Sequence, residues 1–194
     1  MLTHTIVEKA ARAALTPIGD HQLDGFVDSY YLDHGSTPDD RPIYYRFLYQ
    51  LSRLLPGMTM VELGCRKGEA SLHFLRGGGK AAFGIDHTPC HDPELFAGLD
   101  YRVVAGDSES QFSVEAAKEY LGVIDIVFLD TDHRYENTLA EYQLWRPIVR
   151  KGGLFMFDDI RYAGVAQLWK ELTVAKLALL DLHPLTWGFG VLFV

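Results

Sequence analysis

The stretch that decides the fold reads TMVELGCRKGE and spans residues 59–69. Its first five residues are mostly apolar, as in a strand buried within a sheet. Gly64 and Gly68 follow at positions where a backbone can turn sharply or approach a ligand closely. A helix from about residue 69 to 76 would then point its free N–H groups at whatever lies above the strand. The pattern predicts a strand–loop–helix unit that binds a nucleotide.

The spacing of the glycines narrows the class of nucleotide. A dinucleotide loop, G-x-G-x-x-G, would need glycine at positions 66 and 69, where the chain has Arg66 and Glu69. A phosphate-binding P-loop is excluded because no G-K-[ST] follows. What remains is E-x-G-x-x-x-G, which resembles the first motif of class I S-adenosylmethionine (SAM)-dependent methyltransferases, whose ligand has no phosphate. The resemblance implies that SAM is bound by Glu62, Gly64, Cys65, Arg66 and Gly68.

Composition and charge set limits on the function. The 194 residues, 48% hydrophobic and 23% charged, suit one globular domain with a proper core. A net charge of −8 argues against a general nucleic-acid binder, which usually carries a basic face. Residues 1–15 lack a long apolar core, so we expect neither a signal peptide nor a membrane span. We therefore expect a cytoplasmic protein with two free thiols, Cys65 and Cys90, that acts on a small molecule; a homo-oligomer remains open.

Apolar periodicity predicts alternating strands and helices after the first strand. Expected strands are 81–85, 101–105, 124–129, 154–157, 177–182 and 190–194, with residues 151–153 (KGG) as the turn into the fifth strand. Only seven residues separate the last two strands, and a parallel crossover needs about a dozen or more. The final strand must therefore be antiparallel. The predicted fold is a Rossmann-like α/β methyltransferase fold: a mostly parallel seven-stranded sheet, an antiparallel C-terminal strand, and helices on both faces.

The N-terminal part of the chain is harder to assign. A short helix is expected over residues 5–15 and a longer one over 42–55, capped by Asp39 or Asp40. The stretch between them, 16–41, is punctuated by glycine and proline and is expected to be irregular. We divide the chain into a substrate-side segment, 1–41, and a SAM-binding domain, 42–194. Tyr30, Tyr31 and His34 would either pack on the domain's flank or form a lid over the substrate.

Acidic residues stand at the carboxyl ends of the predicted strands. In such a sheet, ligands bind beyond these ends. Asp86 lies 22 residues after Gly64, where an acid can accept both hydroxyls of a ribose. The resemblance implies that Asp107 and Ser108 contact the adenine, although an ordinary helix cap at Asp107 is compatible with the same sequence. We include Asp130, after the fourth strand, among the residues expected to contact SAM.

Three carboxylates should converge where the fourth and fifth strands end: Asp130, Asp158 and Asp159. Such a cluster repels itself unless protons or a cation compensate. Oxygen ligands favour Mg²⁺, with Mn²⁺ or Ca²⁺ next. The alternative is that these residues cap the helices that follow, although capping explains one acid per strand and not two adjacent ones.

The same region carries a second, finer resemblance. The run FLD at 128–130, with KGG and then DD at 158–159, resembles the metal-dependent O-methyltransferases related to catechol O-methyltransferase. The form D-x-D-H-x-Y at 130–135 resembles the macrocin-type O-methyltransferases and the cephalosporin-hydroxylase-like proteins more closely. The similarity covers residues 44–194. It implies a metal bound by the three acids and places His133 at the offset of the catechol branch's lysine, as the general base.

The sequence therefore predicts a SAM-dependent, divalent-metal-dependent O-methyltransferase that acts on a hydroxyl of a small molecule. Two alternatives remain. One is a SAM-binding protein without catalysis, or a hydroxylase-associated accessory protein. The other is an NAD-dependent oxidoreductase, which the missing glycines and the antiparallel last strand disfavour.

Overall fold

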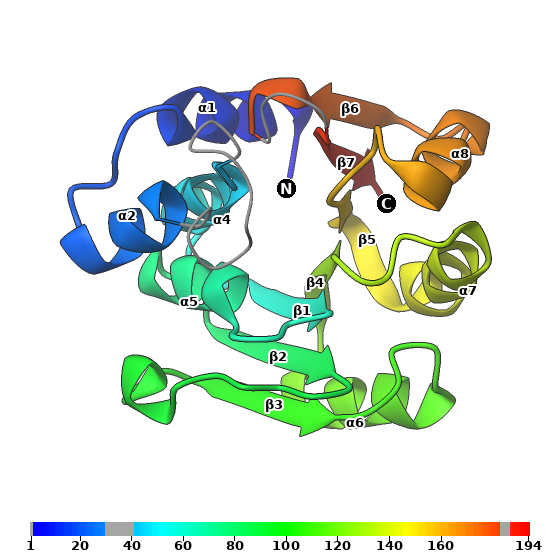
Figure 1. The fold of residues 1–194 in the computed structure, drawn as a ribbon, viewed down its shortest axis with the longest axis horizontal. Helices are drawn as coiled ribbons and strands as arrows, with labels where there is room; N and C mark the ends of the chain where they lie inside the picture. The colour runs from blue at the N-terminus through cyan, green and yellow to red at the C-terminus, as the bar shows by residue number, and fades with distance from the viewer. Residues whose placement is uncertain (1, 30–40, 183–186) are drawn as a thin grey trace.

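The computed structural model describes residues 2–29, 41–182 and 187–194, and its centre is one seven-stranded sheet (Figure 1). The strands are β1 (Thr59–Leu63), β2 (Ala81–Asp86), β3 (Tyr101–Ala105), β4 (Ile124–Leu129), β5 (Val149–Phe157), β6 (Lys176–Leu179) and β7 (Phe189–Phe193). Their order in the sheet is β3-β2-β1-β4-β5-β7-β6, and β7 runs antiparallel to both of its neighbours. The predicted fold class and the antiparallel final strand are confirmed.

Helices cover both faces of this sheet (Figure 1). One face packs under α1 (His4–Ala14), α2 (His21–Asp28), α4 (Tyr44–Leu54) and α5 (Glu69–Arg76). The other packs under α6 (Gln111–Leu121), α7 (Tyr135–Trp145) and α8 (Ala163–Glu171). Short 3-10 turns are η1 (Pro93–Phe96), η2 (Arg146–Ile148) and η3 (Leu180–Leu182).

The alternation of side chains along β4 explains why two helical layers are needed. Ile126 and Phe128 belong to the core on one face of the sheet, and Val127 and Leu129 to the core on the other. Every residue of β4 is buried, as expected for a central strand of a parallel sheet. None of the helices within the described ranges is long and apolar enough to span a membrane.

The stretch 16–41 was expected to be irregular, and this was wrong for part of it, because α2 forms there. Asp20 caps α2 by accepting the backbone N–H groups of Gln22 and Leu23. Leu23 and Val27, one helical turn apart, are buried. The Asp20 cap and this spacing were the available signals, and the flanking glycines hid them. The lid candidates Tyr30, Tyr31 and His34, and the suggested caps Asp39 and Asp40, lie outside the described residues.

Polar contacts dock α2 onto the rest of the domain. The buried Arg46 of α4 donates to Asp24 at 2.8 Å and to Asp28 at 2.9 Å. On α5, Nε2 of the buried His73 lies 3.0 Å from the Leu23 carbonyl oxygen. These contacts hold α2 against α4 and α5.

The fifth strand also differs from its prediction. Residues 151–153 do not turn the chain but lie within β5, which begins at Val149. The register against β4 shifts between Ile124 and Ile126, so the strand continues through an irregularity. Gly152 takes a positive φ of 78° there. Glycine adopts positive φ readily in turns as well, which is why the glycine pair was interpreted as a turn.

Candidate active site

Hydrogen bonds continue the sheet past the ends of its central strands and bring three loops to one edge. Gly64 N–H donates to the Ile85 carbonyl, Asp130 N–H to Leu63, and Asp158 N–H to Leu129, at 2.8, 3.0 and 3.0 Å. The residues after β1, β4 and β5 therefore meet at the carboxyl edge of the sheet. This is the edge where open α/β sheets bind ligands.

Gly64 is required because the loops after β1 and β4 touch. Its φ is +80°, and a Cβ atom there would lie 1.9 Å from the carbonyl oxygen of Asp130. Gly68, with φ +79°, instead precedes α5 and faces the rings of Tyr101 and Phe96. Of the two motif glycines, Gly64 lines the site and Gly68 fits the helix start against β3.

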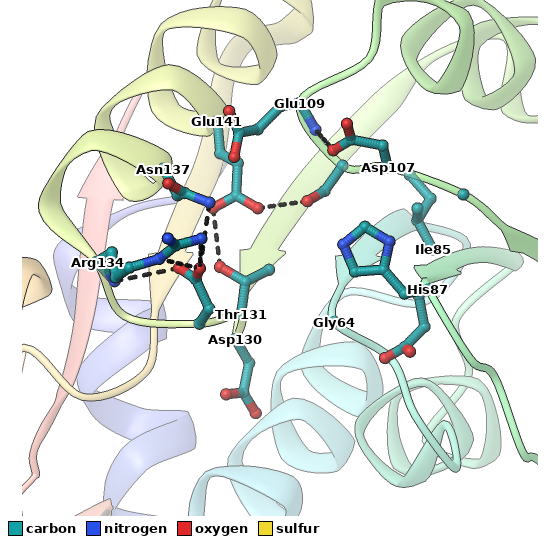
Figure 2. A pocket seen from close by; sticks show the side chains of 14 residues that line it. Gly64, Ile85, His87, Asp107, Glu109, Asp130, Thr131, Arg134, Asn137 and Glu141 are labelled. Atoms are coloured by element: carbon teal, nitrogen blue, oxygen red, sulfur yellow. Dashed lines mark hydrogen bonds and ion pairs between the residues drawn. The ribbon is translucent and has the colours of Figure 1, made fainter.

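A cavity of about 450 Å³ opens above β1, β2 and β4 (Figure 2). Its walls include five of the residues predicted to bind SAM: Gly64, Asp86, Asp107, Ser108 and Asp130. A smaller cavity of about 150 Å³ adjoins it and shares Gly64 and Asp130. The smaller cavity is lined by three more of the predicted residues: Glu62, Cys65 and Arg66. The predicted set thus surrounds two adjoining cavities, with Gly68 outside both.

Asp86 is held firmly at the tip of β2. One carboxylate oxygen accepts the backbone N–H of Arg66 and the other that of Thr88, both at 2.8 Å. These bonds fix the carboxylate against the loop after β1. Each oxygen has two lone pairs, so it can accept a further hydrogen bond from a ligand.

The far end of the larger cavity is built around a buried carboxylate on α7, Glu141. One of its oxygens accepts the hydroxyl of Ser108, and the other accepts that of Thr131 at 2.8 Å (Figure 2). Burial raises the pKa of Glu141 to about 7, although both hydroxyl bonds act to lower it. The loops after β3 and β4 are thereby tied to one helix.

Glu62 plays a similar role at the end of β1. It is buried, and it accepts both the backbone N–H and the hydroxyl of Ser71 in the first turn of α5. Burial raises the pKa of Glu62 to about 8, with smaller contributions from the charges of Glu69 and Asp130. The motif's acid thus holds the helix against the strand while lining the smaller cavity.

The three acids after β4 and β5 gather around His133. Its Nε2 lies 3.1 Å from an Asp159 oxygen and 3.6 Å from an Asp130 oxygen. Burial would lower the pKa of His133, but Asp130, Asp159 and Asp158 together raise it to about 9. The raised pKa favours the imidazolium form, which places a positive charge beside these carboxylates.

Backbone strain marks the same loops. Among the described residues, the non-glycine residues with positive φ are Arg66 (42°), His133 (62°) and Asp159 (56°), one after each of β1, β4 and β5. Each such residue destabilises the folded state by about 1 kcal/mol or more, which contacts in the surrounding structure must offset. The left-handed turn at His133 directs its ring toward the end of β5.

The alternative in which these acids cap helices is not observed. Helix α7 begins after Arg134 and α8 after Tyr162, and neither start has a side-chain cap. The carboxylates are the donor type that Mg²⁺ prefers. Across residues 2–29, 41–182 and 187–194, however, no three His, Cys, Asp or Glu side chains are arranged as a ready metal site.

A family model described as "Methyltransferase domain" matches residues 61–160, about half of the chain. The chain belongs to this methyltransferase family. The match spans β1 to the loop after β5, and so includes the strand ends described above. The prediction of a SAM-dependent methyltransferase is confirmed at the level of family and fold.

Solved structures agree with this fold. The O-methyltransferase TomG from Streptomyces achromogenes, in complex with SAM, superposes with a TM-score of 0.67 at 15% identity, over 94% of this chain and 93% of TomG. An O-methyltransferase from Bacillus cereus, in complex with SAH (S-adenosylhomocysteine), gives a TM-score of 0.58 at 14% identity, over 100% and 92% of the two chains. At such identities the likeness shows the fold alone.

Two further matches are partial. The chain is 44% identical to the uncharacterised protein R132 of Acanthamoeba polyphaga mimivirus over 36 residues, which is 19% of this chain and 16% of R132. It covers half of a methyltransferase-like structure from Streptococcus mutans, with a TM-score of 0.58 at 14% identity over 82% of this chain. The methyltransferase thus spans only part of the length of these relatives.

Two residues of the methyltransferase site were not anticipated from the sequence, Thr131 and Glu141. Thr138, Glu141 and Trp145 are the buried residues of α7 and recur at helical spacing on its inner face. An acid at a buried-face position was the available signal. Asp132, next to His133 in the sequence, pairs with Arg134 and Asn137.

Proposed function

We propose that this methyltransferase transfers the methyl group of SAM to a hydroxyl of a small molecule, with a divalent cation at Asp130, Asp158 and Asp159. The proposal rests on the position of Asp130. This residue lines both cavities and also contacts His133. A ligand-sized cavity and an acid–histidine cluster thus share one residue, as a methyl donor and a proton acceptor would require.

The larger cavity suits the nucleoside of SAM. Its volume of about 450 Å³ lies in the range of small-molecule sites. Asp86 would accept the ribose hydroxyls, while Asp107 and Ser108 lie near the opposite end for the base. The smaller cavity, with the carboxyl groups of Glu62 and Glu69 in its wall, suits the ammonium of the methionine part. The TomG and Bacillus cereus structures, named as complexes with SAM and SAH, support this choice of ligand.

The acid–histidine cluster fits a divalent cation in the type and charge of its donors. Asp130, Asp158 and Asp159 would hold it, and it would lower the pKa of a substrate hydroxyl and orient it. A cation there would also remove the electrostatic cause of the high pKa of His133. The neutral imidazole could then act as a base.

His133 is the residue we assign to proton transfer. As the methyl group leaves the sulfonium sulfur, the C–S bond breaks and an O–C bond forms, which leaves a neutral thioether and a proton from the hydroxyl. Nε2 of His133, which lies 3.1 Å from an Asp159 oxygen and 3.6 Å from an Asp130 oxygen, would accept that proton. Holding donor and acceptor together in one site would supply much of the rate.

Calorimetry with SAM, SAH and NAD tests the cofactor, followed by an activity screen against catechols, vicinal diols and sugar hydroxyls with Mg²⁺. We expect binding of SAM and SAH, none of NAD, and methylation of a hydroxyl in the screen. NAD binding without SAM binding would contradict the proposal. Binding of SAM with no turnover across the screen would favour the non-catalytic accessory protein instead.

A further inference from the structure

The position of Glu141 has a consequence for ligand selection. Its side chain is buried on α7, and its two oxygens accept hydroxyl protons from two different loops (Figure 2). Ser108 follows β3 and Thr131 follows β4, and both line the larger cavity. Each hydroxyl has one proton, and here that proton is directed to Glu141. Toward the cavity, each hydroxyl oxygen therefore presents lone pairs only.

The polarity of this end is fixed by further contacts. The indole N–H of the buried Trp145, one turn along α7, donates to the Ser108 carbonyl at 2.6 Å. Ser108 is thus held to α7 through its main chain and its side chain. Two side-chain donors in the cavity wall, Arg134 and Asn137, both donate to Asp132.

We propose that Glu141 is a positioning residue that makes Ser108 and Thr131 hydrogen-bond acceptors, so that the site selects a base with an exocyclic amine over one with an oxo group. The inference rests on the proposed SAM function and adds the basis of its nucleobase specificity. An amine donates to the two oxygens. An oxo group would meet their lone pairs and remain without a hydrogen bond, which costs binding free energy.

Calorimetry with two ligands tests this inference, SAH and its 6-oxo counterpart S-inosylhomocysteine. The protein would be the full chain at about pH 8.5, where Glu141 is ionised given its pKa of about 7. We expect the wild type to bind SAH tighter by roughly tenfold or more. The quantity compared between variants is the ratio of the two dissociation constants, which a general loss of stability does not change.

Glu141→Gln is the decisive variant. Its amide donates to one hydroxyl, which can then turn its own proton into the cavity and bond an oxo group. We expect the preference for SAH to fall by about tenfold. Glu136→Gln is the matched control, because Glu136 is an exposed glutamate in the first turn of the same helix; it should keep the wild-type ratio. If Glu141→Gln does not fold, Thr131→Val removes one acceptor at similar shape and should also lower the ratio.

The outcomes separate the two proposals. A wild type that binds SAH but does not discriminate, or a Glu141→Gln variant with the wild-type ratio, would overturn the role of Glu141 and leave SAM binding intact. A wild type that binds neither ligand would overturn the proposed function, and the inference with it.

Discussion

The two ends of the site are built on opposite principles. At the Glu141 end, where we propose that the base binds, the carboxylate is buried but accepts two hydroxyls, and the loop carrying Ser108 is also held by Trp145. At the acid–histidine end, Asp130, Asp158 and Asp159 surround His133, and two of the residues there have left-handed backbones. One end has its hydrogen bonds satisfied, and the other concentrates charge and strain.

This difference separates binding from chemistry. Acceptors that are already in place need little rearrangement when a ligand binds, so the Glu141 end should govern affinity and specificity. A cluster of like charges that needs a cation or a proton is suited to moving a proton or holding a metal. Changes at the acid–histidine end should therefore alter turnover, and changes at residues that line the larger cavity should alter affinity for the cofactor.

Removal of the metal should have the largest effect. We expect EDTA to abolish turnover, since without the proposed cation the substrate hydroxyl would not be activated and the carboxylates would again raise the pKa of His133, while calorimetry should still detect SAH binding. Mg²⁺ should raise the melting temperature of the wild type by mass action. Asp158→Asn should reduce that shift. Turnover that survives complete chelation would remove the cation from the mechanism.

Replacement of His133 should come next. We expect His133→Ala to lower kcat by roughly 10²–10⁴, the usual contribution of a general base. The wild-type rate should rise with pH as the imidazolium loses its proton, and that rise should be absent in the variant. SAM affinity should stay near the wild-type value, because the ring lies outside the larger cavity. A variant with wild-type kcat and an unchanged pH profile would show that His133 is not the base.

The buried acid of the first motif should make stability depend on pH. The pKa of Glu62 is about 8 in the folded protein against an ordinary value of 4.5. Between these values the folded state keeps a proton that the unfolded state has released, so the contribution of Glu62 to stability is fully present below 4.5 and is lost as pH rises to 8. The slope from this residue is at most about 1.4 kcal/mol per pH unit.

Denaturant titrations of the ligand-free protein at several pH values would measure this slope. Glu62→Gln should flatten it, because an amide does not titrate. Glu69→Gln, at the half-buried start of α5, is a useful comparison and should leave most of the slope in place. A wild-type stability that increases between pH 5 and 8 would contradict the assignment.

Loss of the acid at the tip of β2 should have the smallest effect of the four. We expect Asp86→Ala to weaken SAM binding by about 1–3 kcal/mol, the cost of leaving ribose hydroxyls without an acceptor. Asp86→Asn keeps one acceptor oxygen and should lose less. kcat at saturating SAM should change little in both. An unchanged affinity in Asp86→Ala would place the ribose elsewhere.

Much of the fold follows from local pattern. The apolar runs of β1 and β4 are predicted to the residue, or nearly so, since a strand buried on both faces has few polar positions that would blur its limits. The edge strand β3 also has its predicted limits, although none of its residues is buried. The predicted gap of seven residues between the last two strands is too short for a parallel crossover, and the antiparallel β7 that it indicated is confirmed. The missed helix α2 and the mistaken turn at 151–153 lie where glycines interrupt the pattern. There, conformation depends on what the backbone packs against.

The sequence by itself determined the sheet, the family motif and the acids at the ends of the strands, because these depend on neighbours along the chain. Only the tertiary structure decided which acids act together. Ser108 and Glu141 are 33 residues apart, yet they meet because α7 packs beside the loop after β3. His133 faces Asp159 and not Asp132 because its backbone takes a left-handed turn before α7 begins. Such contacts depend on packing between distant elements, which local periodicity does not encode.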